Sequence, residues 1–135
     1  MSLFSFSGTQ PKDLGVNDGK LKGCPDTPNC VNSQAPASDK EHAIAPLTYT
    51  GSSTDAISRL KTIIEGMERS KINEVTDSYL YAEFSSKLMG FVDDVEFYAP
   101  PGESIIHTRS AARLGKSDLG VNRKRTEEIR SQFSS

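Results

Sequence analysis

Four short runs of alternating apolar and polar residues constrain the fold of this 135-residue chain more than any other feature. The runs cover about residues 71–76, 79–86, 91–98 and 104–112. The segments between them are short and contain Asp, Ser, Gly or Pro, and such turns join neighbouring strands that run in opposite directions. The pattern therefore predicts an antiparallel sheet built from consecutive hairpins.

Two helices and one further strand are expected around this sheet. After the capping candidates Ser52 to Asp55, apolar residues recur on one helical face, and they are Ala56, Ile57, Leu60, Ile63, Ile64 and Met67. Residues 122–133 predict a second helix with a thinner apolar side, and residues 44–50 predict a short strand. The expected fold class is α+β, an antiparallel sheet of four to five strands with two helices packed on one face.

Residues 1–43 are expected to form a long irregular arm that packs on an α+β domain of residues 44–135, so that the chain makes a single domain. The arm is rich in Gly, Pro, Asn, Asp and Ser, and it holds both cysteines of the chain, Cys24 and Cys30. We assign the cysteines a structural role. Their state stays open between a disulfide, two buried thiols, metal ligands and a redox pair.

Alternation along the strands also assigns side chains to the two faces of the sheet. The residues expected against the helices are Leu80, Ala82, Phe84, Phe91, Val95 and Phe97. The opposite face, expected to be open, collects Tyr79, Tyr81, Glu83, Asp94, Glu96 and Tyr98. In the last strand either of two alternating sets can face the helices, and if Ile106 does so, His107 and Arg109 join the polar face. That face is either a site or a solvated sheet surface with cross-strand charge pairs.

Asp93 falls on the apolar face, between residues that point at the helices. A carboxylate in such a place needs a partner, and Arg109 or Arg113 is the natural one. We expect this pair to fix the geometry of the following loop rather than to take part in chemistry.

A basic stretch follows the fourth run. Between His107 and Arg125 there are six basic side chains and one acidic one, Asp118, in a chain of net charge −2. Asn122 is expected to cap the second helix, which places Arg123 and Arg125 in its first turn. Cations are disfavoured at that end of the helix dipole unless an anion answers them, so the stretch predicts an anion-facing surface.

Three functional interpretations stay open. The first is a non-catalytic binding or accessory module whose ligand, a small anion or an acidic protein segment, is held by the candidates Arg109, Arg113, Asn122, Arg123 and Arg125. The second is a small hydrolase in which His107 acts as general base or acid, with Asp93 or Asp94 orienting it. The third is a purely structural basic loop, in which Asp118 helps to tie the loop to the arm. No cofactor, metal, nucleic acid or membrane span is expected.

The motifs LGVNDGKL, CPDTPNCV, GFVDDVEFY and HTRSAARLGKSDLGVNRKRTEEI together resemble the family called domain of unknown function 1499. The resemblance spans nearly the whole chain, and the N-terminal sequence is most similar to members from cyanobacteria and plastid-bearing organisms. The family has no settled activity, so the resemblance implies no catalytic or binding role for any residue. The N-terminus has neither a basic region nor an apolar core of a signal peptide, and a cytoplasmic location is expected.

Overall fold

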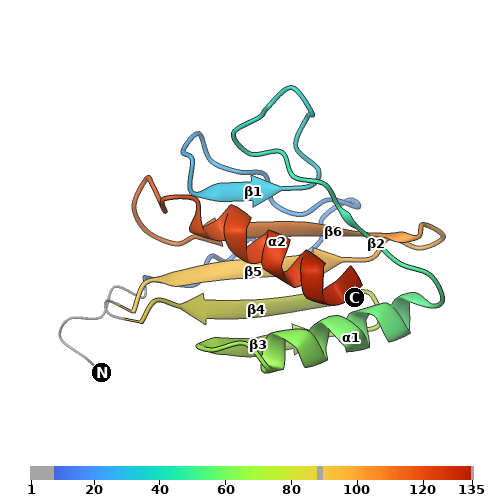
Figure 1. Ribbon diagram of the computed structural model, residues 1–135. Coiled ribbons are helices and arrows are strands. Elements are labelled where there is room, and N and C mark those ends of the chain that lie inside the picture. Colours follow the sequence, from blue (N-terminus) through green and yellow to red (C-terminus); the bar gives the residue numbers. More distant parts are fainter. Residues whose placement is uncertain (1–7, 88–89, 135) are drawn as a thin grey trace.

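The computed structural model describes residues 8–87 and 90–134, which form an antiparallel sheet with two helices on one face (Figure 1). The strands are β1 (Cys30–Asn32), β2 (Leu47–Thr48), β3 (Ser70–Val75), β4 (Tyr79–Ser85), β5 (Val92–Tyr98) and β6 (Ile105–Ala112). The helices are α1 (Ser53–Glu65) and α2 (Val121–Ser134). The main sheet has the order β1-β6-β5-β4-β3, and β2 pairs with β6 off this path. Neither described helix has the length and apolar character needed to cross a membrane.

The α+β class and the antiparallel hairpins are confirmed, and the sheet has six strands where four to five were expected. The additional strand is β1, which lies inside the segment expected to be irregular and pairs Cys30 with Ala111 of β6. Strand β2 is shorter than the run of residues 44–50. The arm was expected only to pack on the domain, and residues 30–32 of it are instead a strand of the sheet.

The main core lies between the sheet and the two helices. Helix α1 begins at a cap formed by Ser52, whose hydroxyl accepts a hydrogen bond from the Asp55 backbone N–H. The fully buried apolar side chains of this core include Leu60, Ile64, Leu80, Val95, Phe97, Ile106 and Ile129. Ile106 faces the helices, so His107 and Arg109 lie on the opposite face. Phe91 precedes β5 and is exposed, contrary to its expected place among the residues against the helices.

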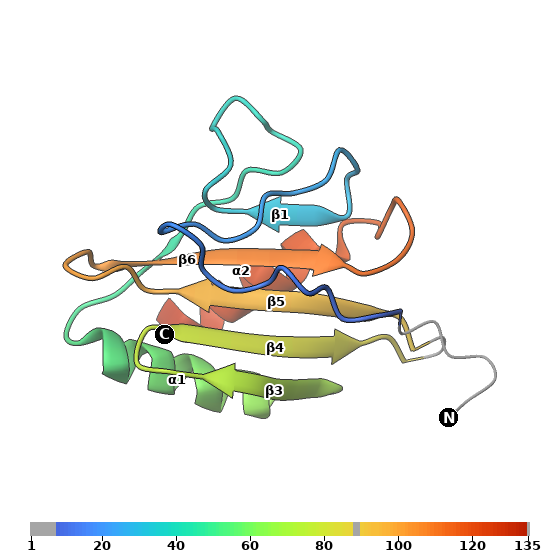
Figure 2. The ribbon, with the colours of Figure 1, turned by 180° about the vertical axis from the view of Figure 1, so that it is seen from behind.

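The second face of the sheet is covered, contrary to the expectation of an open polar surface. Figure 2 shows the arm crossing this face, over β5 and β6. Leu21 of the arm packs with Tyr79 and Tyr81 in a second apolar cluster, with Leu14 and Val16 against it. The arm covers this face because its few apolar residues lie where it passes over the two tyrosines. Burying these side chains against one another removes apolar surface from water. Tyr79, Tyr81, Asp94, Glu96 and Arg109 on this face are consequently buried.

Helix α2 begins at Val121, and its cap is Asp118 rather than Asn122. The Asp118 carboxylate accepts hydrogen bonds from the backbone N–H of Gly120 at 2.8 Å and of Asn122 at 2.9 Å. Burial acts to raise the pKa of Asp118, but the hydrogen bonds from Asn122 and Gly120 outweigh it and hold the pKa below its ordinary value. A carboxylate at this position also matches the positive end of the helix dipole.

Candidate functional site

Four ionic side chains lie beneath the arm on β5, β6 and the residue after β6. They are Asp94, Glu96, Arg109 and Arg113. The antiparallel register places Glu96 opposite Arg109, and Asp94 opposite Ala111. Asp94, Glu96 and Arg109 are buried, so the electrostatic balance among these groups is decided by contacts within the protein rather than by water.

Asp94 and Arg113 form a complete bidentate pair. The Arg113 Nε donates to Asp94 Oδ2 at 2.9 Å, and Arg113 Nη2 donates to Asp94 Oδ1 at 2.8 Å. The Tyr81 hydroxyl donates to the same carboxylate, and Glu83 lies 3.0 Å from Arg113 Nη2. The hydrogen bond with Asp94 raises the pKa of Arg113 above its ordinary value. This pair is thus satisfied without any further ligand.

Glu96 is held by the arm and by β4. The Gly15 backbone N–H and the Tyr79 hydroxyl both donate to Glu96 Oε2, at 2.7 Å and 2.5 Å. Among the described residues, Glu96 Oε1 has no hydrogen-bond partner. Burial raises the pKa of Glu96 above its ordinary value, against the effect of the Tyr79 hydrogen bond.

Arg109 is the least satisfied of the four. Its side chain is only 4% exposed, and its Nη1 lies 4.0 Å from Glu96 Oε1, at the limit of an ion pair. Its Nη2 donates to the Gly23 carbonyl at 3.3 Å, and its Nε has no partner within residues 8–87 and 90–134. Burial lowers the pKa of Arg109. This buried guanidinium has five N–H donors, one carbonyl acceptor and one carboxylate at the limit of an ion pair, so most of its donors are free to bind an anion.

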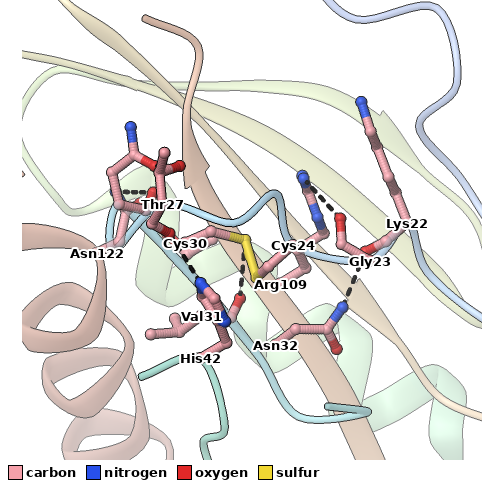
Figure 3. Close-up of a disulfide and its surroundings, with 12 residues drawn as sticks. Lys22, Gly23, Cys24, Thr27, Cys30, Val31, Asn32, His42, Arg109 and Asn122 are labelled. Atoms are coloured by element: carbon pink, nitrogen blue, oxygen red, sulfur yellow. Dashed lines mark hydrogen bonds between the residues drawn. A yellow bond between two sulfur atoms is a disulfide. The ribbon is translucent and has the colours of Figure 1, made fainter. Parts of the chain in front are cut away.

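A cleft of about 390 Å³ opens beside this guanidinium, between the arm and β6. Lys22, Arg109 and Arg113 line it with Asp94, and the arm contributes Pro11 and residues 23–25. Figure 3 shows the Arg109 side chain rising between Gly23 and the disulfide that joins Cys24 to Cys30. The cysteines are thus a disulfide, with an S–S distance of 2.06 Å, and they fix the turn of the arm that forms one wall.

The basic residues at the start of α2 have partners within the chain. Arg125 Nη2 lies 2.8 Å from Asp93 Oδ2. The ion-pair partner of the carboxylate on the helix face is therefore Arg125, and the expected partners Arg109 and Arg113 were wrong. Burial raises the pKa of Asp93, although Arg125 opposes the shift. Arg123 donates to the backbone carbonyls of Lys40 and Glu41. The first turn of α2 therefore ties the helix to β5 and to the arm.

Asn122 is a buried connector between α2, β6 and the arm. Its Oδ1 accepts from the Ser110 hydroxyl at 2.5 Å and from Arg125 at 3.1 Å. Its Nδ2 donates to Asp118 at 2.8 Å and, at 3.4 Å, to the Asn29 carbonyl. A fully buried amide with all these partners has a structural role in this geometry.

His107 lies away from the carboxylates that were expected to orient it. It is paired in register with Tyr98, whereas Asp93 and Asp94 pair with Ala112 and Ala111, and strands advance roughly 3.3 Å per residue. Its Nδ1 lies 3.0 Å from the Ser33 hydroxyl, and burial lowers its pKa. Neither aspartate orients the imidazole in this structure. Within the described residues, no group of three or more His, Cys, Asp or Glu side chains is arranged to hold a metal ion.

Sequence reasoning did not identify the contributions of Gly15, Lys22, Gly23 and Ser33. These residues reach the sheet across long stretches of sequence, for example from Gly15 to Glu96. One signal was present, because the sequence Asp-Leu-Gly-Val-Asn occurs both at residues 13–17 and at residues 118–122. In both copies the glycine N–H donates a hydrogen bond to a carboxylate, which is Glu96 for the first copy and Asp118 for the second.

Two comparisons with known proteins complete the description of the site. A search of curated proteins finds no match. The family model described as "Protein of unknown function (DUF1499)" matches residues 20–133, which include β1 to β6, α1 and nearly all of α2. The chain therefore belongs to the DUF1499 family.

Proposed function

We propose that this protein is a non-catalytic binding module that holds a small anionic group in the cleft between the arm and β6, with Arg109 as its anchor. The supporting observation is the buried Arg109 guanidinium, whose Nε has no partner in the described part of the chain. Leaving such a charge incompletely paired costs several kcal/mol, so an anion that pairs with it is held strongly.

The chemistry of the cleft favours a carboxylate or a phosphate. Arg109 offers a planar fork of donors, which suits two oxygens of one group. Lys22 and Arg113 add positive charge at the lining, whereas the single acid there, Asp94, is already occupied by Arg113 and Tyr81. A cleft of about 390 Å³ accommodates a ligand of a few carbon atoms that carries such a group.

The start of α2 is the other place where an anion was expected. Arg123 and Arg125 are engaged there with carbonyl groups and with Asp93, so an anion must compete with contacts that already exist. In the cleft, the contacts of Arg109 with the Gly23 carbonyl at 3.3 Å and with Glu96 at 4.0 Å are longer, so an anion meets weaker competition there. We therefore place the site at Arg109 and keep the start of α2 as the alternative location.

The experiment is a thermal-shift and calorimetric titration with phosphate, sulfate, citrate and short dicarboxylates. An anion that binds only the folded protein raises its melting temperature by mass action. We expect Arg109→Gln to abolish the shift and Lys22→Gln to weaken binding by roughly three- to tenfold, as the loss of one partly exposed charge contact would. Arg123→Gln is the matched control and should leave the shift unchanged.

Two results contradict the proposal. If Arg123→Gln removes the shift and Arg109→Gln keeps it, the site lies at the start of α2. If no anion shifts the wild-type protein, the module does not bind a small anion. Where Arg109→Gln unfolds the protein, Lys22→Gln decides the question, because Lys22 is partly exposed and its ion pair within the described residues is with the exposed Asp13.

A further inference from the structure

One end of the molecule gathers most of the exposed large apolar side chains. Of the five in the described residues, Phe91, Leu114, Leu119 and Val121 lie in the β4–β5 connection, the β6–α2 loop and the first position of α2. These segments meet at the same end of the sheet, on the left in Figure 1 and on the right in Figure 2. We refer to these four residues as the apolar tip. The fifth, Val75, ends β3 and pairs with Leu80, whereas Ser70 at the start of β3 pairs with Phe84.

The exposure of Leu119 is built into the loop. Leu119 is 93% exposed, and its φ is 56°, a left-handed conformation that residues with a side chain rarely adopt. The Asp118 carboxylate holds this turn through the N–H groups of Gly120 and Asn122. In the other copy of the same five-residue sequence, Leu14 is half-buried against the tyrosine cluster. Glycine adopts a positive φ without this strain. The loop therefore keeps an exposed leucine at a position where its backbone conformation is unfavourable.

A groove and two exposed cations adjoin the tip. Phe91, Leu114 and Val121 line a groove of about 340 Å³. Lys116 lies between Leu114 and Leu119 in the loop, and Lys124 lies one helical turn after Val121 and lines a neighbouring hollow with it. Both lysines are exposed, and neither forms an ion pair with the residues that the structure describes. The one acid in this loop, Asp118, is engaged in capping α2.

We propose that the apolar tip is a docking surface for a membrane that carries anionic lipids. Leu119 and its apolar neighbours enter the boundary between head groups and acyl chains, while Lys116 and Lys124 contact the anionic head groups. The shape favours a bilayer over a protein partner, because Figure 1 shows this loop projecting from the fold, and a protein interface requires a broad surface of about 800 Å² on each partner. The inference is independent of the anion cleft, which lies on the arm side of the sheet.

The test is flotation of the full chain with vesicles of phosphatidylcholine alone or mixed with phosphatidylglycerol. The wild type should float with the mixed vesicles. Leu119→Ser should lower the partition coefficient by roughly tenfold, as expected for one leucine withdrawn from an apolar environment. The double change Lys116→Gln with Lys124→Gln should lower it by roughly tenfold or more on mixed vesicles only. Val75→Ser, which removes an exposed apolar side chain at the other end of β3, should have no effect.

Three outcomes overturn the proposal. The first is that the wild type does not float with either kind of vesicle, and the second is that Leu119→Ser floats as well as the wild type. The third is that the wild type self-associates in sedimentation velocity without vesicles and that Leu119→Ser abolishes this self-association. The last would make the apolar tip an interface between copies of this chain. All four substituted positions are exposed, and unchanged melting temperatures confirm that the variants are folded.

Discussion

Breaking the disulfide between Cys24 and Cys30 should lower the free energy of unfolding by about 2.3 kcal/mol. The bond joins residues six positions apart, and the chain-entropy model gives roughly 8 cal/mol/K for closing a loop of that size in the unfolded state, which is about 2.3 kcal/mol near room temperature. An unfolding entropy of about 2.1 cal/mol/K per residue, taken over 135 residues, converts this into a fall of about 8 °C in the melting temperature.

The assay is calorimetry of the wild type with and without a reductant, beside the variant in which both cysteines are alanine. Reduction keeps both sulfur atoms in place and so isolates the effect of the bond. The double variant also loses the side chain of Cys30, which is fully buried in β1, and should therefore melt slightly below the reduced wild type. The double variant should not respond to the reductant.

A reduced wild type that melts within about 2 °C of the oxidised protein would refute this reasoning, since loop closure would then contribute less than a third of the worked value. An equal response of the double variant to the reductant would show that the effect does not come from this bond. The experiment also bears on location, because disulfides persist in oxidising compartments and are rare in the cytosol. The cytoplasmic location expected from the sequence stays a prediction.

Three further predictions concern buried groups. Asn122→Ala removes the acceptor of the buried Ser110 hydroxyl and should cost about 2–3 kcal/mol in urea unfolding, whereas a loss below about 0.5 kcal/mol would contradict the connecting role. The hydrogen bond with Asp39 raises the pKa of His42 above 6.5, so the protonated imidazole stabilises the fold fully below about pH 6.5 and less as the pH rises through the folded-state pKa. His42→Gln should therefore lose more stability at acidic than at alkaline pH, and a pH-independent loss would refute the linkage. Leu60→Ala, in the fully buried core, should cost about 2–5 kcal/mol, and a urea midpoint equal to that of the wild type would contradict its place there.

The strands and helices were accessible from the sequence because their signals are local. The runs of residues 71–76, 79–86, 91–98 and 104–112 differ from β3, β4, β5 and β6 by one residue at most at each end. Period-two alternation also placed Asp93 on the helix face, where the structure has it. Such alternation indicates which side chains of one strand face the core. The short hairpin turns then indicate that consecutive strands are neighbours, in the order β3-β4-β5-β6.

The identity of ionic partners was not accessible, since it depends on contacts between segments far apart in the sequence. Asp93 was expected to pair with Arg109 or Arg113 and instead pairs with Arg125, because α2 packs across the same face of β5. The cap of α2 was misplaced for a local reason. Asp118 and Asn122 are both capping residue types, and the sequence alone does not show that the Asn122 side chain is drawn into the core by Ser110.

The arm accounts for the largest difference between expectation and structure, and it explains why the candidate site lies where it does. A sheet covered on one face would leave Glu96 and Arg109 in water, where cross-strand pairing satisfies them cheaply. The arm excludes that water. In its place, the Gly15 N–H donates a hydrogen bond to Glu96, and the Gly23 carbonyl accepts one from Arg109. One carbonyl at 3.3 Å and the Glu96 carboxylate at 4.0 Å leave the Arg109 Nε without a partner among the described residues. Covering the second face therefore stabilises the sheet through its tyrosine cluster and, at the same time, buries the incompletely paired guanidinium on which the proposed anion site depends.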